Sequence, residues 1–105
     1  MMTFGERLAQ DRRRFVLDAL NEAAAYQLND LTLKSVLGGF GHLVSRAVIR
    51  GDLEWLEGAR LVKIEKLGAE KMDDGPTVWL ATLTERGLDV VSGEVFTGVA
   101  RRPPG

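Results

Sequence analysis

Two arginines spaced four residues apart are the first candidates for chemistry in this sequence. Arg46 and Arg50 follow Ser45, a residue type that caps helices, so both side chains are expected on one side of a helix near its start. An arginine in such a place pairs in bidentate fashion with guanine or contacts a phosphate. The other interpretation is a solvated helix face that carries two surface arginines, and the acidic neighbours Asp52 and Glu54 favour it. The spacing indicates a candidate DNA-reading face and leaves both interpretations open.

Small and polar residues accompany the two arginines on this face. Ala47 and Gly51 are small enough to let the helix approach a groove closely, and the hydroxyl of Ser45 is available to a phosphate. Glu54, in contrast, would oppose a phosphate contact. The candidate DNA contacts on this helix are therefore Ser45, Arg46, Ala47, Arg50, Gly51 and Glu54.

A polar segment from residue 65 to residue 75 adds two candidate contacts, Lys66 and Lys71. The same segment holds four acidic residues, so its net charge is negative. A loop that lies on phosphates is expected to be basic, because counterion release supplies much of the affinity. The acidic excess favours a solvated loop unless the two lysines alone face the duplex.

The composition excludes several classes of site. The chain has 105 residues, no cysteine and a single histidine, His42. Disulfides, thiolate metal sites and thiol nucleophiles are therefore absent, and most histidine-based metal sites within one chain are ruled out. The glycines at 38, 39 and 41 lack the lysine of a phosphate-binding loop, and no nucleophile has a base and an acid at a suitable spacing. We expect a non-enzymatic protein without cofactor or metal.

Charge and hydropathy point to one ordinary domain. Fourteen Lys and Arg residues stand against fifteen Asp and Glu residues, which gives a net charge of −1. Bulk charge therefore indicates neither a nucleic acid nor a membrane surface as partner. The apolar runs are far shorter than the ~20 residues of a membrane span, and the first residues lack the apolar core of a signal peptide. A cytoplasmic location is the expectation.

Hydrophobic periodicity predicts three helices in the first half of the chain. One covers residues 6–25, the second begins at Asn29 or Asp30, and the third runs from Ser45 to about Gly58. Their predicted core positions are Phe15, Val16, Ala19, Leu20 and Ala23; Leu33, Val36, Leu37 and Phe40; and Ile49, Leu53 and Leu56.

Three consecutive arginines, Arg12, Arg13 and Arg14, form the densest basic cluster of the first helix. Successive helix residues are about 100° apart, so the three cannot share one face. We interpret them as part of a solvated helix surface, with a phosphate-contacting flank or a partner-binding surface as the alternative. Trp55 and Trp79 are interpreted as partly buried packing residues.

The second half of the chain predicts a hairpin and a short helix. Residues 61–67 and 77–83 have strand patterns and enclose a turn-rich segment, and Thr84 caps a helix that ends near Ser92. Residues 26–28 are a candidate third strand. The order predicts an α+β fold of the winged helix-turn-helix type, with a three-helix core, a two-stranded β-wing and a short C-terminal helix. Residues 1–93 form this domain, and residues 94–105 are expected to be a loosely ordered tail.

Two segments resemble known regulators. The run from Ser45 to Glu57 with Arg60-Leu61-Val62 is similar to the recognition helix and first wing strand of ArsR-like proteins, and Leu83-Thr84-Glu85-Arg86-Gly87 is similar to the motif after the wing in MarR- and ArsR-type domains. Residues 52–57 and 81–90 also resemble the small winged-helix proteins of Mu-like phages and prophages. The resemblance implies sequence-specific binding of double-stranded DNA by a homodimer. Metal sensing does not carry over, because the thiolate ligands are missing.

Two hypotheses about function follow. The first is a small DNA-binding transcriptional regulator that reads the major groove with residues 45–57. The second is a winged helix that binds another protein in phage assembly or host takeover, which the net charge of −1 and the acidic wing favour. The two differ in salt dependence, because phosphate contacts weaken steeply with salt and an apolar interface does not.

Overall fold

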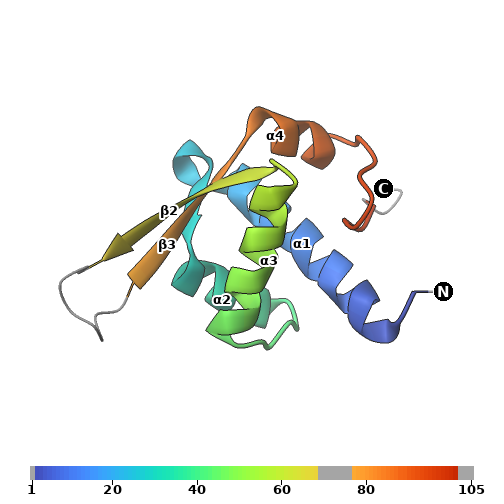
Figure 1. Cartoon of the computed structure of the whole chain (residues 1–105), viewed down its shortest axis with the longest axis horizontal. Helices are drawn as coiled ribbons and strands as arrows, with labels where there is room; N and C mark the ends of the chain where they lie inside the picture. Colours follow the sequence, from blue (N-terminus) through green and yellow to red (C-terminus); the bar gives the residue numbers. More distant parts are fainter. Residues whose placement is uncertain (1, 69–76, 102–105) are drawn as a thin grey trace.

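The computed structural model describes residues 2–68 and 77–101, and within them it has an α+β architecture (Figure 1). Four α-helices, one short 3-10 helix and a three-stranded antiparallel sheet follow one another in these residues. The elements are α1 (Phe4–Glu22), η1 (Ala24–Tyr26), β1 (Gln27–Asn29), α2 (Asp30–Gly39), α3 (Arg46–Gly58), β2 (Val62–Gly68), β3 (Thr77–Leu83) and α4 (Glu85–Val91). This arrangement is compatible with a winged-helix-like fold.

The sheet has the order β1-β3-β2, with both pairs antiparallel. The pairing of β2 with β3 runs from Val62 opposite Leu83 to Gly68 opposite Thr77, which confirms the predicted hairpin. β1 pairs with the middle of β3, one residue later than the predicted third strand. Because directly opposed residues point to the same side of a sheet, Lys66 lies on the same face as Trp79.

Side-chain caps set the starts of the helices. Asn29, Ser45 and Thr84 each accept a hydrogen bond from the backbone N–H three residues on, and Thr3 does the same for α1. Each of these bonds satisfies an amide that has no partner within its helix. The predicted caps of α2, α3 and α4 are thereby confirmed. For α2 the cap is Asn29, and Asp30 is the first helical residue.

The core lies between the helices and one face of the sheet. It is built mainly of leucine and valine side chains from all four helices, completed by Ala81 and Leu83 of β3. Two core assignments are corrected. Leu17, outside the predicted stripe, is fully buried. Phe40 was predicted inside but is 64% exposed, because the helix has ended there and its ring stacks on Phe15 from outside at 5.3 Å.

Residues 94–101 differ from the expected loose tail, since they pack against α1 and α3. Val99 is buried, the backbone N–H of Ala100 donates to the carbonyl of Gln10 at 3.2 Å, and Phe96 meets Trp55 edge-on. Gly98 has a φ of +96°, and a Cβ atom there would stand 2.5 Å from the Trp55 ring. Glycine permits this close approach, so the segment fits tightly over Trp55. Residues 102–105 lie outside the described residues.

Candidate nucleic-acid interface

A buried carboxylate, Asp30, is the centre of the candidate site. It occupies the first position of α2 and has no exposed surface. The residue lies three and seven positions before Leu33 and Leu37, so it falls on the apolar stripe of its own helix. A carboxylate in such a place requires charged or hydrogen-bonding partners, because burying an isolated charge is costly.

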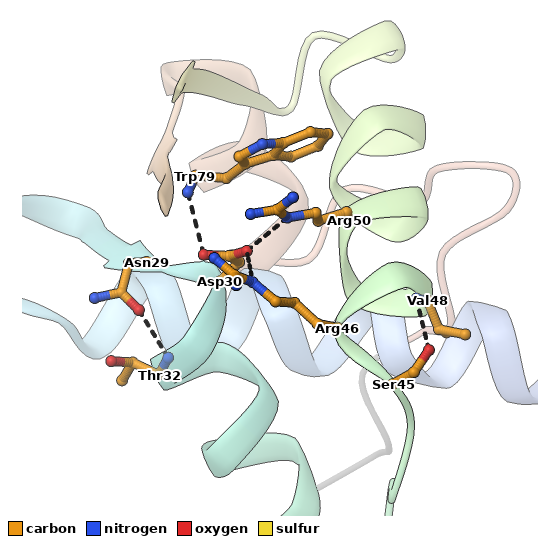
Figure 2. A network of polar contacts seen from close by, with 8 residues as sticks. All are labelled: Asn29, Asp30, Thr32, Ser45, Arg46, Val48, Arg50 and Trp79. Atoms are coloured by element: carbon orange, nitrogen blue, oxygen red, sulfur yellow. Dashed lines mark hydrogen bonds and ion pairs between the residues drawn. The ribbon is translucent and has the colours of Figure 1, made fainter. Parts of the chain in front are cut away.

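Arg46 and Arg50 of α3 supply those partners (Figure 2). Their Nε atoms both donate to Oδ2 of Asp30, over 2.8 Å from Arg46 and 2.7 Å from Arg50. The two arginine side chains keep 30% and 25% of their surface exposed. Their spacing by one turn of α3 therefore serves a shared buried anion, and part of each side chain still reaches solvent.

Trp79 of β3 closes the network from the sheet. Its backbone N–H donates to Oδ1 of Asp30 at 3.1 Å, so the carboxylate connects α2, α3 and β3 (Figure 2). The guanidinium of Arg50 lies 4.7 Å from the Trp79 ring centre and the ammonium of Lys66 lies 4.4 Å from it. Both distances suit a cation–π attraction. Three of the sequence-predicted basic residues thus meet at one place.

The pKa of Asp30 is lowered from its ordinary value. Burial alone would raise it, but the hydrogen bonds from Arg46 and Arg50 and from the backbone of Trp79 favour the ionised form more strongly. The site therefore holds a carboxylate anion at neutral pH. With Arg46, Arg50 and Lys66 around it, the cluster has a positive net charge.

The remaining predicted residues of α3 line its outer side. Ser45, Ala47, Gly51 and Glu54 are all exposed, and Gly51 has open space where a side chain would project. The hydroxyl of Ser45 accepts from the backbone N–H of Val48 at 3.2 Å. Ser45 thus caps the helix next to the arginine cluster. At Ala47 and Gly51 only small side chains or none project from the outer surface of α3. Lys71 lies outside the described residues.

Comparison with known proteins establishes the kinship of the chain. No family model matches it. The protein gp26 of Escherichia phage Mu is 36% identical over 100 residues, which is 91% of each chain. This chain belongs to the gp26 family. An uncharacterized protein of Haemophilus influenzae strain Rd is also 36% identical, over 103 residues that cover 98% of this chain and 93% of the relative.

Membership of the gp26 family confirms the Mu-like part of the resemblance and by itself assigns no activity. The Mu protein is described as uncharacterized, as is the Haemophilus protein. The chain covers nearly the full length of both relatives, so the similarity extends over the whole fold. Winged-helix identity and regulation remain predictions in this family.

The three consecutive arginines of the gp26-family chain are not a solvated surface, which corrects the sequence interpretation. Arg12 forms a bidentate ion pair with Asp52 of α3, at 2.7 and 3.2 Å. Arg13 lies 4.0 Å from the Trp55 ring centre and donates to the carbonyl of Gly98 at 2.9 Å. Each guanidinium therefore ties α1 to another element.

Arg14 has the most buried of the three side chains. Its terminal nitrogens donate to the last carbonyl groups of α4, those of Val90 and Val91, at 3.2 and 3.1 Å, and its Nε pairs with Asp18. A cation at a helix C-terminus satisfies carbonyls that have no partner within the helix and is attracted by its dipole. Because all three arginines act in the fold, the candidate interface is built from α3 and the hairpin and not from this basic cluster of α1.

Neither a metal centre nor a membrane span is found in the described part of the chain. Residues 2–68 and 77–101 contain no group of three or more potential metal-ligating side chains. None of the helices in these residues is long and apolar enough to cross a bilayer.

Asp30 and Trp79 are the members of the site that sequence reasoning missed. The signal for Asp30 was present, because an acidic residue that falls on the i, i+3, i+7 apolar stripe of a helix needs a cation. The same signal marks Asp52, which lies between core positions Ile49 and Leu56 and is buried against Arg12. Trp79 contacts Asp30 through its backbone N–H, and a pattern of side chains in the sequence cannot predict a backbone contact.

Proposed function

We propose that this gp26-family protein is a winged helix-turn-helix protein that binds double-stranded DNA and acts as a transcriptional regulator. In this assignment α2 and α3 form the helix-turn-helix, β2 and β3 form the wing, and α3 enters the major groove. The element order and the pairing of β1 with β3 support it.

The observation that carries the proposal is the orientation of two arginines by one buried carboxylate. Asp30 fixes the Nε side of Arg46 and Arg50, while a quarter to a third of each side chain stays exposed. A guanidinium held in this way loses less conformational entropy when it meets a base edge or a phosphate. The Asp30 network thus prepares two adjacent cations on the helix that would read the groove.

The shape of α3 next to the arginines supports the same function. Ala47 and Gly51 are exposed and small, so at these two positions no large side chain holds the helix axis away from a groove. Lys66, on the wing strand beside Trp79, adds a third positive charge from a second element. A phosphate backbone lying across α3 and β2 would meet all three cations.

Fluorescence anisotropy with a labelled duplex of random sequence tests the proposal. Three phosphate contacts per protomer predict about 40-fold weaker binding at 200 mM salt than at 50 mM salt. Gly51→Glu places a negative side chain in open space on α3 and improves helix propensity, so the fold is retained and binding is expected to fall by at least about tenfold. The matched control is Val95→Glu, at an exposed site outside α3 and the hairpin.

Absence of binding at 50 mM salt would contradict the proposal. Equal affinity of the Gly51→Glu and Val95→Glu proteins would show that α3 is not the contact surface, even if the chain binds DNA. Loss of affinity only in Gly51→Glu, together with the steep salt dependence, supports groove reading by α3.

A second candidate function is a winged helix that binds another phage or host protein. Exposed apolar side chains just before and within the first turn of α3 favour it, since Leu43 is 87% exposed and Val48 is also exposed. Such an interface would tolerate salt. If the duplex titration shows no binding, recovery of one partner at 500 mM salt that is lost with Leu43→Glu would support this function.

A further inference from the structure

The first turns of α1 extend beyond the rest of the molecule. In Figure 1 the N-terminal part of this helix projects from the body, and the other elements gather around its second half. The buried residues of α1 begin only at Arg14, whereas Phe4 is 76% exposed. An exposed phenylalanine at the tip of a projecting helix leaves a large apolar side chain in water.

Phe4 belongs to an apolar strip on the outer side of α1, with the exposed Asp11 at its edge seven residues after Phe4. Leu8 and Phe15 follow at spacings of four and seven residues, so the three lie along one face of the helix over about 16 Å. The ring of Phe40 stacks on Phe15 and is itself mostly exposed, which extends the face at its far end. We call Phe4, Leu8, Phe15 and Phe40 the apolar strip.

Two opposite charges flank the strip on one side. Arg7 and Asp11 are four residues apart and exposed, and neither side chain forms a hydrogen bond or ion pair with the residues that the structure describes. When two copies of a helix pack antiparallel about a two-fold axis, the same flank of each faces its counterpart. Arg7 of one copy then lies across from Asp11 of the other, twice per pair.

We propose that the apolar strip is a self-association surface, on which a second copy of this chain packs its α1 antiparallel. Phe4 of one copy covers the Phe15–Phe40 end of the strip of the other, and the two Arg7–Asp11 pairs fix the antiparallel direction. The charge pattern selects a second copy as the occupant because each flank complements itself only after a two-fold rotation. One exposed face of a short helix is smaller than the ~800 Å² per partner of a standard interface, so a micromolar dimer is expected.

Sedimentation velocity of the full chain without DNA, from about 1 to 200 µM, tests this surface. The natural protein is expected to shift from monomer to dimer over this range. Arg7→Glu alone and Asp11→Arg alone each turn two attractions into repulsions, so each should weaken the dimer by about tenfold. The combined Arg7→Glu, Asp11→Arg protein restores both pairs with reversed sign and should regain the original affinity.

Removal of the apolar contact made by Phe4 tests the same surface independently of the charges. Phe4→Ser should abolish the dimer, whereas Val95→Ser, a similar change at an exposed apolar site outside the strip, should leave it intact. Phe4 contributes nothing to the core, so the Phe4→Ser protein should unfold at the same urea concentration as the natural one.

A monomer throughout the concentration range would overturn the proposal. A dimer unaffected by Phe4→Ser, or not restored by the double charge reversal, would place the interface elsewhere. The measurement contains no DNA, so its outcome is independent of the proposed DNA binding.

Discussion

Replacement of Asp30 by alanine is the most informative perturbation of the fold. It removes the acceptor of two arginine Nε atoms and of the Trp79 backbone N–H from a site with no solvent access. Breaking a buried ion pair typically costs ~3–5 kcal/mol. The two arginines are a quarter to a third exposed and regain hydration, so we expect the low end, about 3 kcal/mol.

Asparagine separates charge from hydrogen bonding at the same position. Asp30→Asn keeps one acceptor oxygen but loses the negative charge, so a smaller loss of about 1–2 kcal/mol is expected. Both values are large beside a total stability of ~5–15 kcal/mol for a domain of this kind. Asp89→Ala, at an exposed aspartate of α4, is the control and should change stability by less than about 0.5 kcal/mol.

Urea unfolding followed by tryptophan fluorescence at pH 7 measures these differences. The order expected for the free energy of unfolding is natural protein, then Asp30→Asn, then Asp30→Ala. A double-mutant cycle of Asp30→Asn with Arg50→Gln should give a coupling energy above about 1 kcal/mol, because the two side chains are in direct contact. A loss below about 1 kcal/mol in Asp30→Ala would refute the reasoning.

Three further predictions follow from described contacts. Because the pKa of Asp30 is lowered in the folded protein, the ionised carboxylate contributes its full stabilisation above the ordinary pKa of 3.8 and loses it as the pH falls through the lower pKa of the folded state. The free energy of unfolding should therefore drop below about pH 4, and should drop less in Asp30→Asn; urea midpoints from pH 2 to pH 7 measure this. Gly87→Ala should destabilise the protein by about 1–3 kcal/mol in thermal unfolding, because the new Cβ collides with the Leu61 carbonyl; unchanged stability would mean that the backbone adapts freely. Arg14→Met should cost about 2 kcal/mol in urea unfolding by leaving the last carbonyls of α4 without a donor, whereas Lys34→Met on the exposed side of α2 should cost less than about 0.5 kcal/mol; equal effects would contradict this role of Arg14.

Local signals in the sequence were sufficient for most elements of this fold, but α1 is Phe4–Glu22 rather than residues 6–25, and η1 was not predicted. Each predicted cap stands immediately before its helix, and the alternation of Val62 and Ile64 with charged residues marks β2. Such signals act over three or four residues and need no knowledge of the rest of the chain. The errors occur where the partner is distant, as for Phe40, whose place depends on where α2 ends, and for residues 94–101, which depend on Trp55.

The candidate site was predicted only in part for the same reason. Arg46 and Arg50 were found from their spacing, yet their shared partner lies 16 and 20 residues earlier in the chain. The pairing of Arg12 with Asp52 spans 40 residues, so the helix containing the arginine gives no sign of it. A charged residue on an apolar stripe indicates that an oppositely charged or hydrogen-bonding partner exists, but only the tertiary structure identifies that partner.

The contacts of α1 with the C-terminal segment bear on how the chain folds during synthesis. The core side of α1 packs against α2, α3, β3 and α4, and hydrogen bonds run from Arg13 to Gly98 and from Arg14 to Val90 and Val91. Part of the covering of α1 therefore comes from a helix of this domain that is translated after α2, α3 and both strands of the hairpin. Completion of the hydrophobic core must wait until Val99 has been translated, so an emerging chain leaves part of the apolar side of α1 uncovered until then. A nascent chain that stalls before α4 leaves the part of α1 that packs against α4 exposed to water.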